Sequence, residues 1–257
     1  MNVAEQKARL IEDLYDVYQK GKADGMLQGG NDWYDTFWNA FQNGGANEQD
    51  CQRDENNAPI GSRKNYQQAF AREGWDEASF KPKYSMKPEN CSQMFWNNLS
   101  ITDLEKALQT AGVTLDTSET TNFLQFVQSS SITVVPKIDM RKSTNSNFAL
   151  SSDKLITVRE LMVSESTPFS DTFKASINLE EITISGTIGQ NGFDISKSGK
   201  VSKASIESII GHLSDTTSGL TITLPLQSIQ QNFEGGYHGQ EFTELKNTKP
   251  NWGIAYG

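Results

Sequence analysis

Residues 170–186 read SDTFKASINLEEITISG, and the spacing of their apolar residues is the pattern that decides the fold of the middle of the chain. Phe173 is followed six residues later by Leu179, and Ile182 and Ile184 lie three and five positions beyond that leucine. Four other phenylalanines precede aliphatic residues by six to eight positions in the same way: Phe95, Phe126, Phe148 and Phe193.

The aliphatic residues that follow these phenylalanines return at a nearly constant interval. The intervals are 31, 23, 24 and 22 residues between Ile101, Ile132, Leu155, Leu179 and Val201. A period of about 20 to 30 residues that ends in a short apolar strand is typical of a solenoid, whose units share one core because none can bury its own apolar face. We therefore expect an α/β chain with four phenylalanines in a single buried column: Phe95, Phe126, Phe148 and Phe173.

Local patterns predict the elements of this region. β-branched and aliphatic residues indicate short strands at 133–135, 161–163 and 182–184, and the alternating segment LTITL indicates another at 220–224. Helical spacing predicts helices at 104–109 and 204–213. The tail, with aromatic and aliphatic residues between 233 and 254, is expected to cap the last open edge of the stack.

The N-terminal part predicts a separate helical module. Residues 3–24 form an amphipathic pattern in which Leu10, Leu14 and Val17 share one face. Because an isolated helix of this length is marginal in water, that face must pack on a second helix or on copies of itself.

Residues 31–43, NDWYDTFWNAFQN, predict a second helix with a broad aromatic face. The aromatic residues concerned are Trp33, Phe37, Trp38 and Phe41. Aromatic side chains fill cores and also anchor interfaces, so a core helix and a docking face both stay open. We take these residues and the apolar face of the first helix as the candidate assembly interface.

Three regions follow from these patterns. Residues 1–45 are the helical attachment or oligomerisation module, residues 46–89 are a linker and aromatic adaptor, and residues 90–257 are the repeat region with its cap. The linker begins with the segment 44–64, which is almost free of apolar residues and rich in turn formers.

Composition narrows the classes of partner. The net charge is −9 and the pI is about 4.8, so nucleic acid is not expected as a partner, since phosphate binding needs clustered Lys and Arg. No run of apolar residues is long enough for membrane insertion, and the charged N-terminus lacks the apolar segment of a cleaved signal peptide. Cys51 and Cys91 have no metal-type spacing and are either two free thiols or a pair.

The sequence contains no arrangement of residues that is typical of a catalytic site. His212 falls in a predicted helix and is expected to pack or cap it, and His238 lies in a Gly-rich loop with only a weak metal signal. Glu180 and Glu181 are adjacent on a strand and so point to opposite faces. No G-x-S-x-G elbow or phosphate loop occurs. We expect no enzyme activity, no catalytic residues, no cofactor and no metal.

The unit around Phe173 resembles the BspA-like leucine-rich repeat, which has a small residue three positions after the Phe, then Leu, then Ile. The repeat family carries Cys at the small position, whereas this chain has Asn98, Ser129, Ser151 and Ser176 there, all small polar residues able to hydrogen-bond to inward turns. The resemblance implies an N-terminal helical module followed by a short leucine-rich-repeat-like β/α solenoid with a C-terminal cap.

The order of segments along the whole chain resembles virion-associated proteins of phages and prophages of Gram-positive gut bacteria. The segments that carry this resemblance are 16–25, 33–45, 70–84, 218–224 and 247–256. It implies a non-enzymatic structural protein of the virion, such as a tail-fibre or baseplate appendage assembled in the host cytoplasm. Other virion proteins would bind its N-terminal helices, a host receptor would bind its repeats, and a homo-oligomer such as a trimer is expected.

Two alternatives stay open. The protein could be a head decoration or collar fibre with a purely structural role, or a bacterial cell-surface repeat adhesin. Neither the receptor nor the position on the virion follows from the sequence.

The attachment role gives a direct test. Residues 1–64 expressed alone are expected to self-associate or to bind purified virions, because their apolar helix faces need a partner. Analytical ultracentrifugation and co-sedimentation with particles measure the two outcomes. A monomer that leaves every particle unbound would contradict the attachment role.

Overall fold

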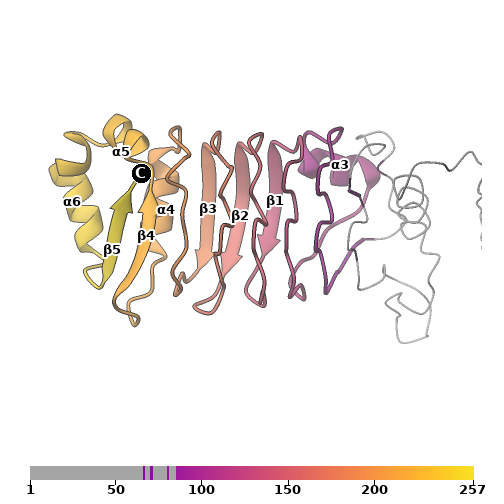
Figure 1. Ribbon diagram of the computed structural model, residues 1–257, viewed down its shortest axis with the longest axis horizontal. Helices are drawn as coiled ribbons and strands as arrows, with labels where there is room; N and C mark the ends of the chain where they lie inside the picture. The colour runs from indigo at the N-terminus through magenta and orange to yellow at the C-terminus, as the bar shows by residue number, and fades with distance from the viewer. Residues whose placement is uncertain (1–65, 67–69, 72–79, 81–84) are drawn as a thin grey trace, which may run out of the picture.

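The computed structural model describes Tyr66, Phe70, Ala71, Phe80 and residues 85–257 (Figure 1). This part is mixed α/β, with four α-helices and two small parallel sheets. The elements in chain order are α3 (Leu104–Ala111), β1 (Val134–Asp139), β2 (Thr157–Val163), β3 (Glu181–Gly186), α4 (Lys203–Gly211), β4 (Leu220–Leu224), α5 (Leu226–Asn232), the 3-10 helix η2 (Gly236–His238), α6 (Gln240–Asn247) and β5 (Trp252–Tyr256).

One row of elements contains the larger sheet, and we call it the sheet wall. Strands β1, β2 and β3 are neighbours in chain order and pair in parallel, with Val135 beside Val158 and Val158 beside Ile182. Strand β3 buries alternate residues, as expected when one face of a sheet covers a core. Strands β1 and β2 depart from strict alternation, and the pairing of β2 with β3 shifts register between Val158 and Leu161. The predicted strands at 133–135, 161–163 and 182–184 are thereby confirmed, apart from Thr133 at the first boundary.

Helices continue this row at both ends, and both were predicted. Helix α3 begins after Asp103, whose carboxylate accepts the Lys106 N–H, and it ends at Gly112 in the left-handed conformation. Helix α4 takes the place of a strand beside β3, because the Ser205 and Ser208 hydroxyls each accept a backbone N–H of that strand at 2.9 Å.

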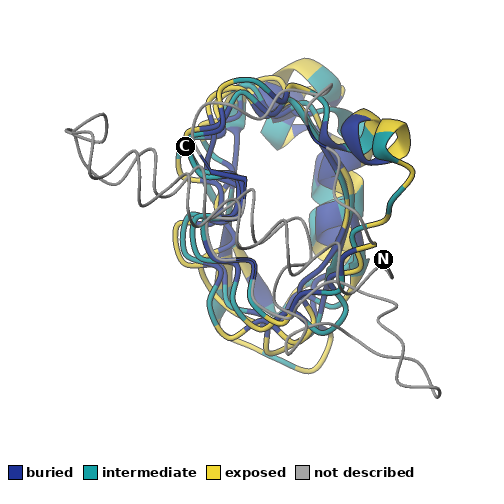
Figure 2. Ribbon diagram, turned by 90° about the vertical axis from the view of Figure 1, so that its right-hand side faces the viewer, coloured by how far each residue is buried: buried dark blue, intermediate teal, exposed yellow. Residues whose placement is uncertain are grey.

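A second row lies opposite, and we call it the turn wall. It consists of the segments 90–98, 122–130, 145–152, 168–176 and 192–198, followed by β4 and β5. Parallel bridges join Asn90 to Asn122 and Asn122 to Asn145. The chain passes from the turn wall to the sheet wall and back, and each such passage is called a circuit. Figure 2 looks along the stack and shows the circuits superposed around one oval outline.

The interior between the two walls is one apolar core. All five periodic aliphatic residues are fully buried, as the 22- to 31-residue intervals predict: Ile101, Ile132, Leu155, Leu179 and Val201. The same core includes Tyr66, Phe70 and Phe80, which belong to the segment assigned to the adaptor. The Tyr66 and Phe70 N–H groups donate to the carbonyls of Asn90 and Met94, both at 2.8 Å.

The prediction of a single phenylalanine column is wrong in two respects. Phe95 and Phe173 share a row, but in the register set by the Asn bridges Phe126 belongs to the adjacent row. Phe148 is only half-buried, because its backbone is left-handed, with φ of 55°. The aligned residue of the preceding circuit, Gln125, is also left-handed and half-exposed, so this position turns its side chain outward.

Buried hydroxyls link the circuits inside the stack. The Ser152 hydroxyl donates to the Ser130 carbonyl at 2.7 Å, Ser176 to Leu150 at 2.5 Å, Ser198 to Ser176, and Ser228 to Ser198 at 3.1 Å. The predicted inward role of Ser176 is confirmed, and Asn98 likewise donates to the Phe70 carbonyl at 2.9 Å. Ser129 is exposed instead and Ser130 takes its place, because Ser129 is left-handed.

The C-terminal elements close one end of the stack. Strand β4 was predicted, and β5 pairs with it in parallel from Leu220–Trp252 to Leu224–Tyr256. Helices α5 and α6 were not predicted individually, because Pro225 and Gly239 at their starts make no side-chain cap. Phe242 of α6 packs on Phe233, with ring centroids 5.1 Å apart.

The different burial of Phe126 and Phe148 predicts very different losses of stability on substitution by alanine. Phe126→Ala is expected to lower the free energy of unfolding by about 3–5 kcal/mol, because it empties a fully buried site. Phe148→Ala, the matched control, is expected to cost about 1 kcal/mol or less, since its half-exposed ring contributes chiefly the contact with Lys174. Urea titration followed by circular dichroism measures both. Equal costs would contradict the described placement of Phe148.

Candidate functional site

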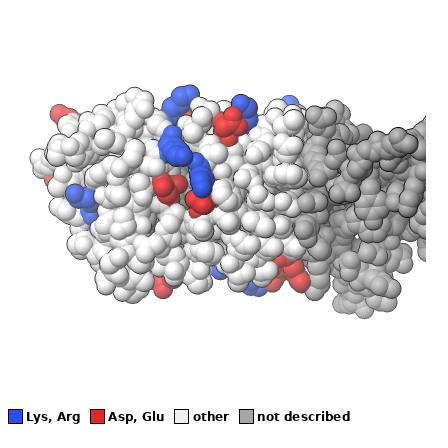
Figure 3. Space-filling view, in the orientation of Figure 1, with Lys and Arg blue, Asp and Glu red and all other residues white. Residues whose placement is uncertain are grey.

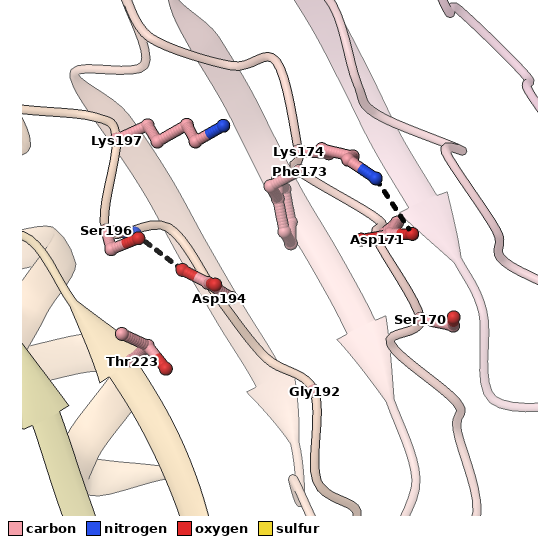
Figure 4. Close-up of a pocket in the computed structure, with 9 residues that line it drawn as sticks. All are labelled: Ser170, Asp171, Phe173, Lys174, Gly192, Asp194, Ser196, Lys197 and Thr223. Atoms are coloured by element: carbon pink, nitrogen blue, oxygen red, sulfur yellow. Dashed lines mark hydrogen bonds and ion pairs between the residues drawn. The ribbon is translucent and has the colours of Figure 1, made fainter. Parts of the chain in front are cut away.

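A hollow of about 400 Å³ opens on the turn wall between the segments 168–176 and 192–198 (Figure 4). Strand β4 contributes to its edge through Thr223. The residues that line it are Ser170, Asp171, Phe173, Lys174, Gly192, Asp194, Ser196, Lys197 and Thr223.

The hollow exists because the hydrogen bonding between circuits stops there. At equivalent positions of three preceding circuits, Phe95 donates its backbone N–H to Phe126, Val127 to Ala149 and Leu150 to Thr172, each at 2.9 Å. The next residue of this series is Phe173. Within the described part of the chain, no backbone hydrogen bond joins the segment 168–176 to the segment 192–198.

The core beneath the hollow is packed and hydrogen-bonded. The buried Phe169 and Phe193 rings meet with centroids 5.1 Å apart, and the buried Ser198 hydroxyl donates to the Ser176 carbonyl. The Phe193 ring also lies 5.4 Å from that of Phe173, so it fills the interior beneath the hollow. Gly192 has φ of 93°, and a Cβ there would lie 3.4 Å from the Phe169 backbone, so glycine leaves this edge bare.

The two long sides of the hollow carry the same charge pattern. Asp171 and Lys174 lie on one side, and Asp194 and Lys197 on the other. Each pair reads Asp-x-x-Lys, and the second copy begins 23 positions after the first. The Lys174 ammonium lies 3.4 Å from the Asp171 carboxylate and 5.1 Å from the centre of the Phe148 ring. This lysine is therefore held by its own circuit and the preceding one, on the side away from the second copy.

The second copy is arranged differently. One Asp194 carboxylate oxygen accepts the Ser196 N–H at 2.9 Å, which orients the carboxylate toward the rim. Lys197 is exposed and makes no ion pair with any residue that the structure describes. Figure 3 shows this face of the molecule as largely uncharged, with a small group of acidic and basic side chains near its middle. The hollow thus offers one oriented carboxylate and one exposed ammonium that are not paired with each other.

A second hollow, of about 460 Å³, lies beside the end of β1, and its charges are already paired. Arg141 donates to both carboxylate oxygens of Asp139, with its terminal nitrogen at 2.7 Å. Burial acts to raise the pKa of Asp139, but the hydrogen bonds from Arg141 outweigh it and the pKa is lowered. The two charges are therefore already neutralised by each other within the local structure.

The residues predicted as the assembly interface lie outside the described part of the chain, and so does Cys51. They are Leu10, Leu14, Val17, Trp33, Phe37, Trp38 and Phe41. Cys91 is a free, buried thiol, and burial raises its pKa to about 12. Its reactive thiolate form is therefore suppressed at neutral pH.

Both histidines lie at the ends of helices. His212 follows α4 as its C-cap, and its Nδ1 lies 2.7 Å from the Ser208 carbonyl, in agreement with the predicted capping role. His238 ends the 3-10 helix and is exposed. In residues 85–257 and the four earlier described positions, no three His, Cys, Asp or Glu side chains converge as a metal site would need.

Sequence reasoning missed the hollow and the residues that line it. The signal that could have located it is the Asp-x-x-Lys pair at 171–174 and 194–197, because its interval of 23 matches the repeat period. Without the register of the circuits, this repetition does not reveal that the two copies face each other.

The chain was compared with known protein families, curated proteins and solved structures. No protein family, curated protein or solved structure matches the chain. In the described residues, no helix has the length and apolar character that crossing a bilayer requires.

Proposed function

We propose that this protein is a non-enzymatic structural component of a bacteriophage virion, of the tail-fibre or baseplate type, that displays a binding surface toward the host cell. In this proposal the circuits form a leucine-rich-repeat-like solenoid with a C-terminal cap. The turn wall is the surface displayed, and the hollow is its binding site.

The observation that carries the proposal is the hollow on an otherwise bonded wall. Binding sites are typically concave, with a few oriented polar groups on a supporting framework. Here Asp194 is oriented by the Ser196 N–H, and an exposed Lys197 lies beside it, above an apolar interior that is packed on Phe169, Phe173 and Phe193. The framework on both sides is tied by hydrogen bonds to the circuits beyond, so the backbone that carries these side chains is fixed.

The remaining parts of the proposal concern residues outside the described part. The module 1–45 attaches the protein to other virion proteins or forms a homo-oligomer such as a trimer. The virion is the proposed location, reached after assembly in the host cytoplasm. An oligomer would present several copies of the hollow, which raises avidity for a repetitive cell surface.

An adsorption experiment tests this role. The purified full chain, added to host cells before the phage that carries it, is expected to slow adsorption in proportion to its concentration, because it occupies the same receptor. Counting unadsorbed particles over time gives the rate. The variant Leu179→Asp, which places a charge in the core, is the control for non-specific effects.

Two outcomes contradict the proposal. Unchanged adsorption at high concentrations of the folded chain would favour a decoration or collar role without a receptor. Slower adsorption that the Leu179→Asp variant reproduces would mean that the folded surface is not responsible.

A further inference from the structure

We propose that the hollow between the segments 168–176 and 192–198 binds a carbohydrate, as a single compact sugar ring with its substituents. This inference rests on the proposed binding role and narrows it to a ligand class. It follows from the donors and acceptors of the hollow, from its size and from the backbone hydrogen bonds beside it.

The polar groups of the hollow suit hydroxyl partners. A hydroxyl both donates and accepts, so a ligand with several of them is satisfied by a site that mixes donors with acceptors. Lys197 supplies donors, the Asp194 carboxylate supplies an acceptor, and the hydroxyls of Ser170, Ser196 and Thr223 supply both. The Phe173 N–H adds a donor, because it lacks the bond that its equivalents in three circuits make.

The floor of the hollow suits the other character of a sugar ring, its C–H face. Gly192 exposes bare backbone at the edge, and the methylene stems of Lys174 and Lys197 line the sides. Phe173 lies between them but is only 2% exposed, so it supports the floor from below. A ligand that is polar at its rim and apolar on its faces therefore meets complementary surface at both. A uniformly apolar ligand would strip water from Asp194 and Lys197 without replacing their hydrogen bonds.

The backbone hydrogen bonds beside the hollow decide between a ring and an extended chain. A peptide strand could in principle add to the open row of backbone groups, as strands do at sheet edges. Here the Thr172, Lys174 and Ser176 N–H groups already donate to carbonyls of their own segment, so this side of the hollow lacks the row of free backbone donors that an added strand needs. The remaining space of about 400 Å³ falls within the range typical of small-ligand sites.

The charges argue against a simple anion site. Each lysine comes with an aspartate three residues earlier in the chain, so the hollow gathers two carboxylates with its two ammonium groups. Inorganic phosphate would be attracted by Lys197 but repelled by Asp194 and Asp171. Sugar hydroxyls have no such conflict, because they donate to carboxylates and accept from ammonium groups.

The test measures binding of named sugars to the full chain. The probes are the methyl glycosides of glucose, galactose, N-acetylglucosamine, N-acetylgalactosamine, rhamnose and glucuronic acid, screened by saturation-transfer NMR and titrated by calorimetry. Inorganic phosphate and an unstructured hexapeptide are screened alongside. At least one glycoside is expected to bind, and neither of the other probes.

Substitutions locate the site. Asp194→Ala and Lys197→Ala are expected to weaken binding about tenfold or more, because each removes a charge-assisted hydrogen bond. Ser170→Trp is expected to abolish binding by filling the hollow. Lys154→Ala is the matched control, since this exposed lysine pairs with Asp153 outside the hollow, and its affinity should change less than about twofold.

Several results would overturn the inference. They are no saturation transfer to any glycoside, binding of phosphate or peptide instead, or glycoside binding that survives the Asp194, Lys197 and Ser170 substitutions. Failure of the wider proposal is distinguishable from these. If sugars bind at the hollow but the chain never slows adsorption, the host-binding role fails and the sugar site stands. If the chain slows adsorption but no sugar binds, the host-binding role stands and only the sugar proposal fails.

Discussion

Hydrogen bonds between one circuit and the next are the interaction on which this structure depends. Each circuit is too short to form a core or a sheet alone, so its backbone groups must be satisfied by its neighbours. On the sheet wall this is done by β1, β2 and β3 and by the serine hydroxyls of α4. Inside the stack, Ser152, Ser176 and Ser198 bond to carbonyls of the preceding circuit. Small polar residues are therefore tolerated inside an apolar core because each has a partner.

The candidate site is an interruption of the same bonding. Where Phe173 follows Phe95, Val127 and Leu150 in the series, no carbonyl of the next circuit receives its N–H, and a hollow replaces the bond. Local loss of bonding normally costs stability, but the Phe169, Phe173 and Phe193 rings fill the interior below. The hollow can thus be open to a ligand while its walls stay fixed, which is the property that a binding surface needs.

Much of the architecture was predictable because burial of aliphatic residues follows sequence spacing directly. The intervals from Ile101 to Val201 located the core, and β-branching located the three strands. The prediction that Phe148 is buried was wrong because a left-handed backbone turns its side chain outward. No residue type in that segment indicates this backbone conformation. The hollow could not be predicted, because it arises from a missing hydrogen bond between segments whose register only the fold sets. The predicted N-terminal interface, from Leu10 to Phe41, stays a prediction.

Amide hydrogen exchange in the native full chain, resolved by NMR, tests the interrupted bonding most directly. The account predicts slow exchange at Val127 and Leu150, whose N–H groups donate to the next circuit, and much faster exchange at Phe173, the equivalent position beside the hollow. Protection at Phe173 equal to that at Leu150 would show that the circuits are bonded throughout. In that case the hollow, and the binding role built on it, would not exist.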